Sequence, residues 1–199
     1  MDGATRDVAK IREMNFPVFA RDTSVYDSMN RQRVVDMDVP VQIGFNRRFD
    51  PSHRKVALAA QNGEIGALEQ VLISSRDPEP PPKEYYLVAG GMLRDMTIHD
   101  FDLARFVLNE EVEKVTALSA TLFDPVAREI GEIDSVMILM QTESGKLCHI
   151  NNSRHASYGY DQRLEAHGSK GMIRSENHEW TTVEPVSYTH LTLPTILLV

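Results

Sequence analysis

The spacing of apolar residues predicts alternating strands and helices over the first half of the chain. Val39–Phe45 and Leu68–Ser75 carry the β-branched and apolar residues that are typical of strands. Pro51–Ala60 has the pattern of a helix, and Met92–Leu108 has the strongest helical spacing in the chain. Pro80–Pro82 exclude both a helix interior and a central strand, so we expect a loop there.

The second half of the chain has the pattern of successive strands. The predicted strands are Val112–Phe123, Ser135–Gln141, Lys146–Arg154, Gln162–His167 and Met172–Glu176, with a further one at Glu179–Val183. Short turns between them favour antiparallel neighbours and therefore a meander. The predicted fold class is α+β, with a predominantly antiparallel open sheet that helices cover on one face. Ser135–Met140 is continuously apolar, which predicts a strand buried on both sides and a sheet face that meets a partner subunit.

Composition narrows the class of protein. The 199 residues are 42% hydrophobic and 25% charged, as in an ordinary globular domain. A formal net charge of -8 repels phosphate backbones, so nucleic acid is not an expected partner. Cys148 is a single cysteine, which fits a reducing, cytoplasmic location. No apolar run approaches the roughly 18 residues that a membrane span needs, and the start lacks the apolar core of a signal peptide.

The candidate chemistry lies in the predicted helix Met92–Leu108. Asp95, His99 and Asp102 are spaced i, i+4 and i+7, which places them along one edge of an ideal helix. The adjacent stripe, which we expect to face the core, consists of Met92, Met96, Leu103 and Val107. An imidazole can accept an alcohol proton near neutral pH, and a carboxylate one turn away can orient it. A second carboxylate offers acceptors for polyol hydroxyls.

Three interpretations of this polar edge stay open on spacing alone. Surface ion pairs at i, i+3 and i, i+4 are the most common outcome for such residues on a helix. A metal site would need a further ligand from elsewhere, because the edge holds one histidine, and we predict no metal. The third interpretation is acid/base catalysis by His99 with Asp95.

Two other segments carry polar side chains where a strand is predicted to end. Asn46–Asp50 follow the first strand, a position at which open α/β proteins place ligand contacts, and Arg47 or Arg48 could lie along a cofactor or substrate, although adjacent arginines more often solvate a loop. Asn151–Asp161 is polar and aromatic, and Tyr158 within it has a hydroxyl that could bind a substrate hydroxyl. Tyr160 could equally be a packed aromatic residue.

Several of these segments, taken in order, resemble a known family. They are GFNRRFDPSH, the stretch from SSRDPEPPP to GGMLRDMTIHDFDLARFVL, and NNSRHASYGYDQRLEAHGSKGMIRSEN, which together span about Val41 to Asn177. The ordered set is similar to the glucose-fructose oxidoreductase/inositol dehydrogenase (GFO/IDH/MocA) family, most closely to its bacterial inositol 2-dehydrogenases.

The resemblance implies a role for each candidate residue. His99 matches the catalytic histidine and Asp95 its carboxylate partner, while Asp102 matches an inositol-binding acid. Tyr158 matches a tyrosine that contacts the substrate. Arg47, with Asn46 beside it, matches residues that line the site near the junction of two domains.

The resemblance also implies an activity, a cofactor and an assembly. A ring hydroxyl of myo-inositol or a related polyol would be oxidised to a ketone, with the hydride passing to NAD. The intact protein would be a homo-oligomer, a tetramer in this family. The sequence departs from the family in having no G-x-G-x-x-G fingerprint and no Glu-Lys-Pro motif, so we expect the isolated chain to be inactive. The alternative hypothesis is a non-catalytic β-sheet interaction module that derives from the same fold.

The expected organisation has three parts. Residues 1–38, with a short helix predicted at Ser24–Val35, resemble the remnant or end of a dinucleotide-binding domain. Residues 39–185 form the substrate-binding domain. Residues 186–199 break the preceding composition and resemble a translated sequencing adapter, so we interpret them as a non-native tail.

Overall fold

The computed structural model describes residues 18–20, 36 and 41–177. The helix predicted at Ser24–Val35, the strand at Glu179–Val183 and the tail 186–199 therefore lie outside the described residues. Near the start, β1 (Val18–Ala20) pairs in parallel with β2 (Val41–Ile43).

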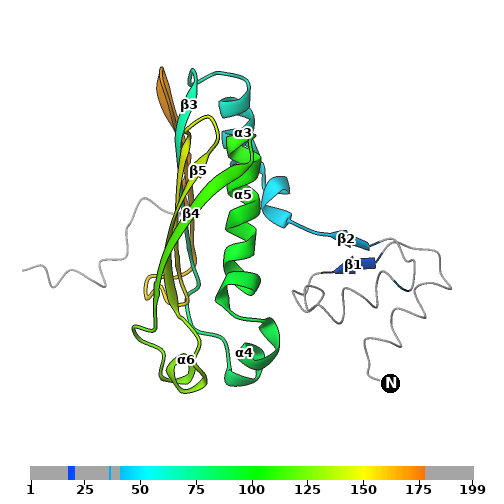
Figure 1. The fold of residues 1–199 in the computed structure, drawn as a ribbon, viewed down its shortest axis with the longest axis vertical. Coiled ribbons are helices and arrows are strands. Elements are labelled where there is room, and N and C mark those ends of the chain that lie inside the picture. Colours follow the sequence, from blue (N-terminus) through cyan, green and yellow to red (C-terminus); the bar gives the residue numbers. More distant parts are fainter. Residues whose placement is uncertain (1–17, 21–35, 37–40, 178–199) are drawn as a thin grey trace, which may run out of the picture.

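A six-stranded sheet forms the main body (Figure 1). Its strands are β3 (Leu68–Arg76), β4 (Val112–Ala120), β5 (Ser135–Thr142), β6 (Leu147–Ser153), β7 (Asp161–Gly168) and β8 (Gly171–Ser175). The spatial order is β4-β5-β6-β3-β7-β8, and each pair of neighbours is antiparallel except β3 with β6. The predicted fold class, an open and predominantly antiparallel sheet with helices, is confirmed.

The predicted meander is wrong at one place, because β3 lies between β6 and β7. It pairs in parallel with β6 and in antiparallel fashion with β7. The connection from β6 to β7 covers residues 154–160, which is long enough to pass the end of one intervening strand at about 4.8 Å per strand spacing. Short connections therefore did not require these two strands to be neighbours.

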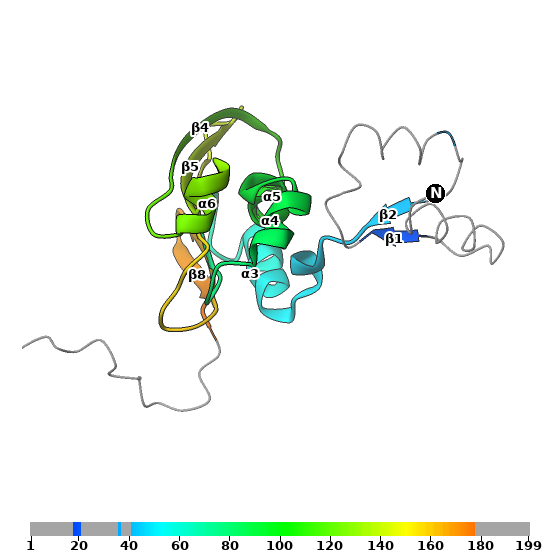
Figure 2. The same cartoon turned by 90° about the horizontal axis from the view of Figure 1, so that it is seen from below.

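Helices cover one face of the sheet, as the edge-on views show (Figures 1 and 2). They are α3 (Pro51–Gln61), the π-helical turn η3 (Leu93–Thr97) and α5 (Ile98–Leu108). The Asp50 side chain accepts the backbone N–H groups of Ser52 and His53, which fixes the start of α3. No helix in the described part of the chain is long and apolar enough to cross a membrane.

Two short helices were not predicted. α4 (Lys83–Ala89) begins immediately after Pro82, and α6 (Pro125–Ile130) begins with Asp124 as its N-cap. Both start at a proline or directly after one, where the fixed φ suits a first turn. They lie together at one end of the sheet (Figure 1).

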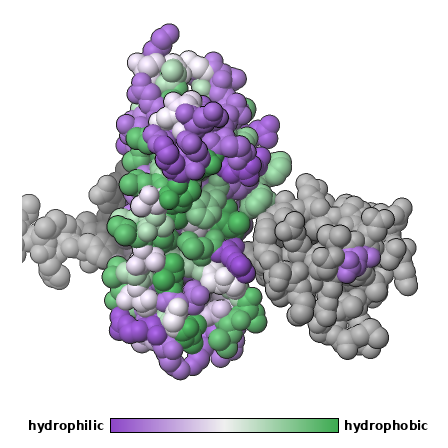
Figure 3. All heavy atoms as spheres, in the orientation of Figure 1, coloured by the Kyte–Doolittle hydropathy of each residue, from purple (hydrophilic) through white to green (hydrophobic). Residues whose placement is uncertain are grey.

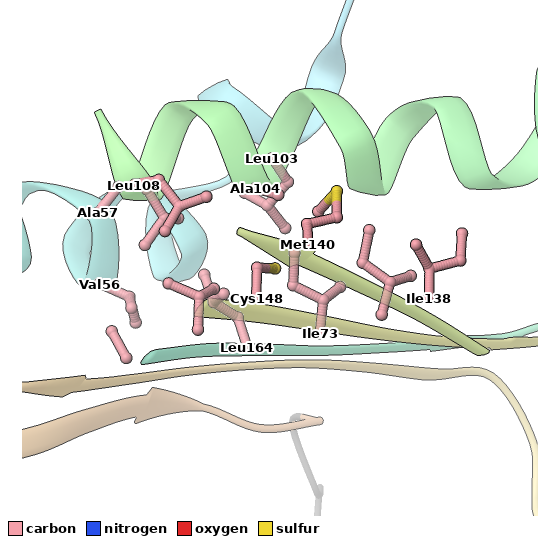
Figure 4. Close-up of a cluster of buried hydrophobic side chains, with 14 of the residues drawn as sticks. Val56, Ala57, Ile73, Leu103, Ala104, Leu108, Ile138, Met140, Cys148 and Leu164 are labelled. Atoms are coloured by element: carbon pink, nitrogen blue, oxygen red, sulfur yellow. The ribbon is translucent and has the colours of Figure 1, made fainter. Parts of the chain in front are cut away.

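The core lies between the helices and the inner face of the sheet (Figure 4). Alternate residues of the strands supply one side of it, among them Ile73, Ile138 and Ile150, each no more than 1% exposed. The predicted apolar helix stripe faces this core: Met92, Met96, Leu103 and Val107 are all buried. That prediction is confirmed.

The opposite face of the sheet is open in this chain. Met137 and Leu139 of β5 are 56% and 61% exposed, so the prediction that this strand is buried on both sides is wrong for the single chain. The register sets Leu118 of β4 beside Met137 on the same face. Apolar side chains also gather along the middle of the described body at its β4 edge, with hydrophilic ones at its upper end (Figure 3).

Candidate functional site

Polar side chains replace the apolar core at one end of the interface between α5 and the sheet. Because β3 and β6 are parallel, their carboxyl ends meet at the same edge of the sheet, and antiparallel β7 begins there. Ser75, Asn152 and Asp100 lie at this end and are each no more than 1% exposed. Buried polar groups at such a place must bond to one another, so the end of the sheet is built as a hydrogen-bond network.

Asp100 is the centre of this network. Its Oδ1 accepts from Arg47 and from the Ser75 hydroxyl, the latter at 3.1 Å. Its Oδ2 accepts from Asn152 Nδ2 at 2.7 Å. Gln162 of β7 donates to the Ser75 hydroxyl at 2.6 Å. One carboxylate thereby connects α5 to β3, β6 and the 3₁₀ turn η2 (Asn46–Phe49), and through Ser75 to β7.

Asp102, two residues after Asp100 on α5, is bound by Arg48, the arginine that follows Arg47. Arg48 donates from Nε and Nη2 to its two carboxylate oxygens at 2.7 and 2.6 Å. Asp102 is 4% exposed, and the Arg48 guanidinium lies 5.3 Å from the centre of the Phe106 ring. The hydrogen bond to Asp102 raises the pKa of Arg48. The carboxylate expected to bind substrate hydroxyls therefore holds Arg48 against α5.

Asp95 is held by two donors from outside its own helix. Tyr85 of α4 donates its hydroxyl proton to Oδ1 at 2.5 Å, and Arg154 donates from Nη2 to Oδ2 at 2.6 Å. Arg154 follows β6, and a second nitrogen of its guanidinium lies 3.4 Å from Asp77. The carboxylate of Asp95 is therefore oriented by α4 and β6.

His99 is half-buried beside these ion pairs. Its Nδ1 is buried and has no hydrogen-bond partner among the described residues. The centres of the His99 and Phe45 rings lie 6.3 Å apart in an edge-to-face arrangement. Burial lowers the pKa of His99 and the charge of Arg47 lowers it further, whereas the charges of Asp95 and Asp102 raise it. The imidazole is thus biased toward its neutral form, which is the form that can accept a proton.

The three residues of the predicted edge share an electrostatic environment but not a set of partners. Asp95 lies in the π-helical turn, whose i→i+5 spacing is wider than the 3.6 residues per turn on which the prediction rested. Asp95 bonds to Tyr85 and Arg154, and Asp102 bonds to Arg48. The charge of Asp95 raises the pKa of His99, and the expectation that Asp95 orients the His99 ring stays a prediction.

The other predicted residues lie at different depths. Arg47 is largely buried and Asn46, beside it in η2, is exposed. Tyr158 is 47% exposed, but its hydroxyl donates to Asp161 and accepts from Arg76, both at 2.6 Å.

Tyr160, and not Tyr158, is linked to the polar end, because it forms a hydrogen bond with Arg47. Burial lowers the pKa of Arg47, and a hydrogen bond with Tyr160 opposes this shift. The side chain of Tyr160 is 58% exposed, so it is not the packed aromatic residue that the sequence left open. Tyr160 is therefore linked to the polar end through Arg47.

Sequence reasoning missed Asp100 and Ser75, and it included Asn152 and Arg154 only as members of the polar segment Asn151–Asp161, with no role of their own. Asp100 carried a signal, because on an ideal helix it lies within about 40° of Met96 and Val107, on the apolar stripe. A carboxylate in line with buried methionine and valine must find a partner in the core. Ser75 carried no signal, and the polar segment at the predicted strand end did not distinguish Asn152 and Arg154 from their neighbours, since only the sheet order brings these residues together.

One cavity lies at the carboxyl-terminal ends of α3 and α5, away from the polar end, and another lies near the carboxyl ends of β3 and β6. The first, of about 610 Å³, has Arg48, Arg105 and Phe106 among its lining residues, and the second, of about 390 Å³, lies on the open face of the sheet. Neither is lined by His99 or Asp95. Within the described residues, no group of three or more His, Cys, Asp or Glu side chains is arranged to hold a metal ion.

Comparison with known proteins defines the class of this domain. A family model described as the GFO/IDH/MocA C-terminal domain matches residues 53–174, and the chain therefore belongs to the GFO/IDH/MocA family. A second model, described as Aldolase/RraA, matches residues 1–54, most of which lie outside the described residues.

The relatives are inositol dehydrogenases. An inositol 2-dehydrogenase of Rhizobium meliloti is 51% identical over 151 residues, covering 76% of this chain and 46% of the relative. The crystal structure of a myo-inositol dehydrogenase from Corynebacterium glutamicum has a TM-score of 0.73 at 40% identity, over 84% of this chain and 58% of that one. A scyllo-inositol dehydrogenase of Lactobacillus casei, solved with NAD(H) and scyllo-inositol, has a TM-score of 0.60 at 30% identity, over 74% of this chain and 45% of that one. The chain thus spans about half the length of the curated relatives it matches.

The buried pair of Asp100 and Arg47 predicts a large stability effect. Asp100→Ala leaves the Arg47 cation without its buried partner, so we expect the free energy of unfolding to fall by about 3–5 kcal/mol. Asp102→Ala is the matched control on the same helix. Its partner Arg48 is more exposed, so a loss of about 1 kcal/mol is expected. Urea unfolding measures both, and equal losses would contradict the central place of Asp100.

The lowered pKa of His99 predicts how stability depends on pH. The unfolded state binds a proton at His99 more readily than the folded state, so stability falls as the pH drops below roughly 6.5. Burial also lowers the pKa of His53, with the same sign. His99→Gln should therefore flatten, but not abolish, the loss of stability between about pH 7 and 5. His149→Gln is the control, and an unchanged slope in His99→Gln would refute the assignment.

Proposed function

We propose that this chain carries the substrate domain, residues 39–185, of an NAD-dependent inositol-type dehydrogenase. The reaction is oxidation of a ring hydroxyl of myo-inositol or a related polyol to a ketone, with the hydride passing to NAD. The observation that supports it most is the half-buried His99, whose lowered pKa keeps the imidazole neutral between Arg47 and two carboxylates. The names of the relatives supply the substrate class, and a cytoplasmic location fits such an enzyme.

In this proposal His99 accepts the hydroxyl proton. The negative charges of Asp95 and Asp102 favour the imidazolium as it forms, while Arg47 opposes it, so the base strength of the ring reflects both. Asp95 is fixed by Tyr85 and Arg154, which leaves the His99 ring free to meet a substrate hydroxyl. The protein thereby contributes orientation and electrostatics.

The proposed substrate-site residues besides His99 and Asp95 are Arg47, Asn46, Tyr158 and Asp102, with Tyr160 beside Arg47. Arg47 and Asn46 lie on η2, and the hydrogen bond of Arg47 with Tyr160 places that tyrosine beside them. Tyr158 and Asp102 already use their polar atoms on Asp161 and Arg48. Their contribution to substrate binding is therefore to shape the site through these partners.

We assign the cofactor to a nucleotide-binding domain outside residues 41–177. The sequence has no G-x-G-x-x-G, which is the loop that holds a dinucleotide pyrophosphate. NAD supplies the hydride acceptor when it is bound. We therefore expect no turnover by the 199-residue chain alone.

The decisive test uses a full-length enzyme that joins this sequence to a complete nucleotide-binding domain. We expect NADH formation that depends on myo-inositol, and a decrease in kcat of about 10²-fold or more in His99→Ala through loss of the general base. His167→Ala, on β7 and away from the apolar patch of β4 and β5, is the control and should retain activity. Unchanged turnover in His99→Ala would remove His99 from the mechanism. Absence of any polyol-dependent activity in the parent would favour the non-catalytic interaction module.

We also propose that copies of the protein associate through the open face of the sheet. Leu118, Met137 and Leu139 are 78%, 56% and 61% exposed, and the strand register places them together. A monomer rarely leaves such a contiguous apolar patch in water. A closed oligomer buries it by pairing the same face of two subunits, and a tetramer is our expectation for the intact enzyme.

A single charge on this face should disrupt the assembly. Leu139→Lys places a cation at the centre of the apolar patch, so we expect light scattering to show a shift from oligomer toward monomer. Leu87→Lys makes the same change on α4, where the side chain is 67% exposed and away from the sheet face. It should leave the mass unchanged. A parent protein that is a well-behaved monomer would overturn this proposal.

A further inference from the structure

Arg154 is an arginine that the fold places inside the protein. It follows the last residue of β6, and its side chain is 5% exposed. Its backbone N–H donates to the Asp134 carbonyl at 2.8 Å, and its guanidinium lies 5.8 Å from the centre of the Tyr86 ring. Burying a cation is unfavourable unless it gains strong partners, so these anchors indicate that Arg154 serves the groups it contacts.

The guanidinium bridges two carboxylates unequally. Nη2 donates to Asp95 at 2.6 Å, whereas Nη1 lies 3.4 Å from Asp77. The third nitrogen, Nε, is buried and has no hydrogen-bond partner in the described part of the chain. Burial raises the pKa of Asp77, and the nearby charge of Asp95 raises it further, while Arg154 opposes both. The short contact, and with it most of the directional bonding, goes to Asp95.

This contact decides what Asp95 can do for His99. Tyr85 occupies the first oxygen of Asp95 and Arg154 the second, so the carboxylate is turned toward α4 and β6. The Nδ1 atom of His99 is buried and has no hydrogen-bond partner among the described residues. A direct hydrogen bond between His99 and Asp95 would stabilise the imidazolium and raise the pKa of the ring. The ring would then already be protonated near neutral pH and could not accept a substrate proton.

We propose that Arg154 is the positioning residue of the candidate active site: by holding Asp95 away from His99, it keeps the imidazole neutral and free to take a substrate proton. The catalytic consequence of this inference rests on the proposed function. The effect of Arg154 on Asp95 and on the pKa of His99 does not. The charged groups around His99 are Arg47 from η2, Asp95 from η3 and Asp102 from α5. Those around Asp95 are Arg154, Tyr85 and Asp77.

The test is an NMR titration of the His99 imidazole in the 199-residue chain. In Arg154→Met, Asp95 is released toward His99, so we expect the pKa of His99 to rise by about half a unit or more. Arg154→Lys restores a cation and should return the pKa to near the parent value. Tyr85→Phe removes the other donor to Asp95 and should raise the pKa in the same direction. Arg163→Met removes a cation from the far face of the sheet and is the matched control.

The outcomes separate the two proposals. A His99 pKa that rises neither in Arg154→Met nor in Tyr85→Phe would overturn the positioning role. If Arg154→Met does not fold, Tyr85→Phe and Arg154→Lys still decide, because the first must raise the pKa and the second must not. In the full-length enzyme, the acidic limb of the pH profile of kcat/KM should move by the same amount as the NMR pKa. A shift by NMR with no shift in that profile would uphold the positioning role and refute His99 as the base.

Discussion

The buried carboxylate of Asp100 is the constraint on which the polar end of this domain depends. A charge with no solvent exposure must be neutralised and fully bonded, and Asp100 meets this requirement with Arg47, Ser75 and Asn152. Those partners come from η2, β3 and β6. The sheet order that sets β3 between β6 and β7 is what brings them to one point. Arg154 directly follows β6, so the same strand order helps to position it beside Asp95. The fold and the candidate site therefore depend on the same arrangement of strands.

Much of the fold followed from the pattern of apolar residues. Helix α3, helix α5 and most strands of the main sheet lie close to their predicted positions, because alternation and 3.6-residue spacing report which side chains must face a core. The insertion of β3 between two later strands did not follow, since connection length permits several strand orders. The π-helical turn before Ile98 was also hidden, because no local propensity marks an i→i+5 spacing.

The candidate site was predictable where its residues share one helix, and at Arg47, which follows a predicted strand. His99 and Asp95 were found by their spacing along η3 and α5, and they do influence each other electrostatically. Asp102 was found in the same way, but its partner Arg48 is far away in sequence. Arg154, Ser75 and Asn152 enter the site through long-range pairing of strands, about which spacing along the chain says nothing. The resemblance to the GFO/IDH/MocA family supplied the function class that geometry alone left open.

The domain thus has two surfaces with different proposed roles. The apolar sheet face is proposed for association, and the polar end is proposed for proton transfer. The most direct measurement of that account is a crystal structure of the full-length enzyme with a polyol and NAD. It should place a substrate hydroxyl within about 3 Å of the His99 imidazole while Asp95 stays bonded to Arg154. A polyol bound away from His99, or an Asp95 carboxylate hydrogen-bonded to the imidazole, would contradict it.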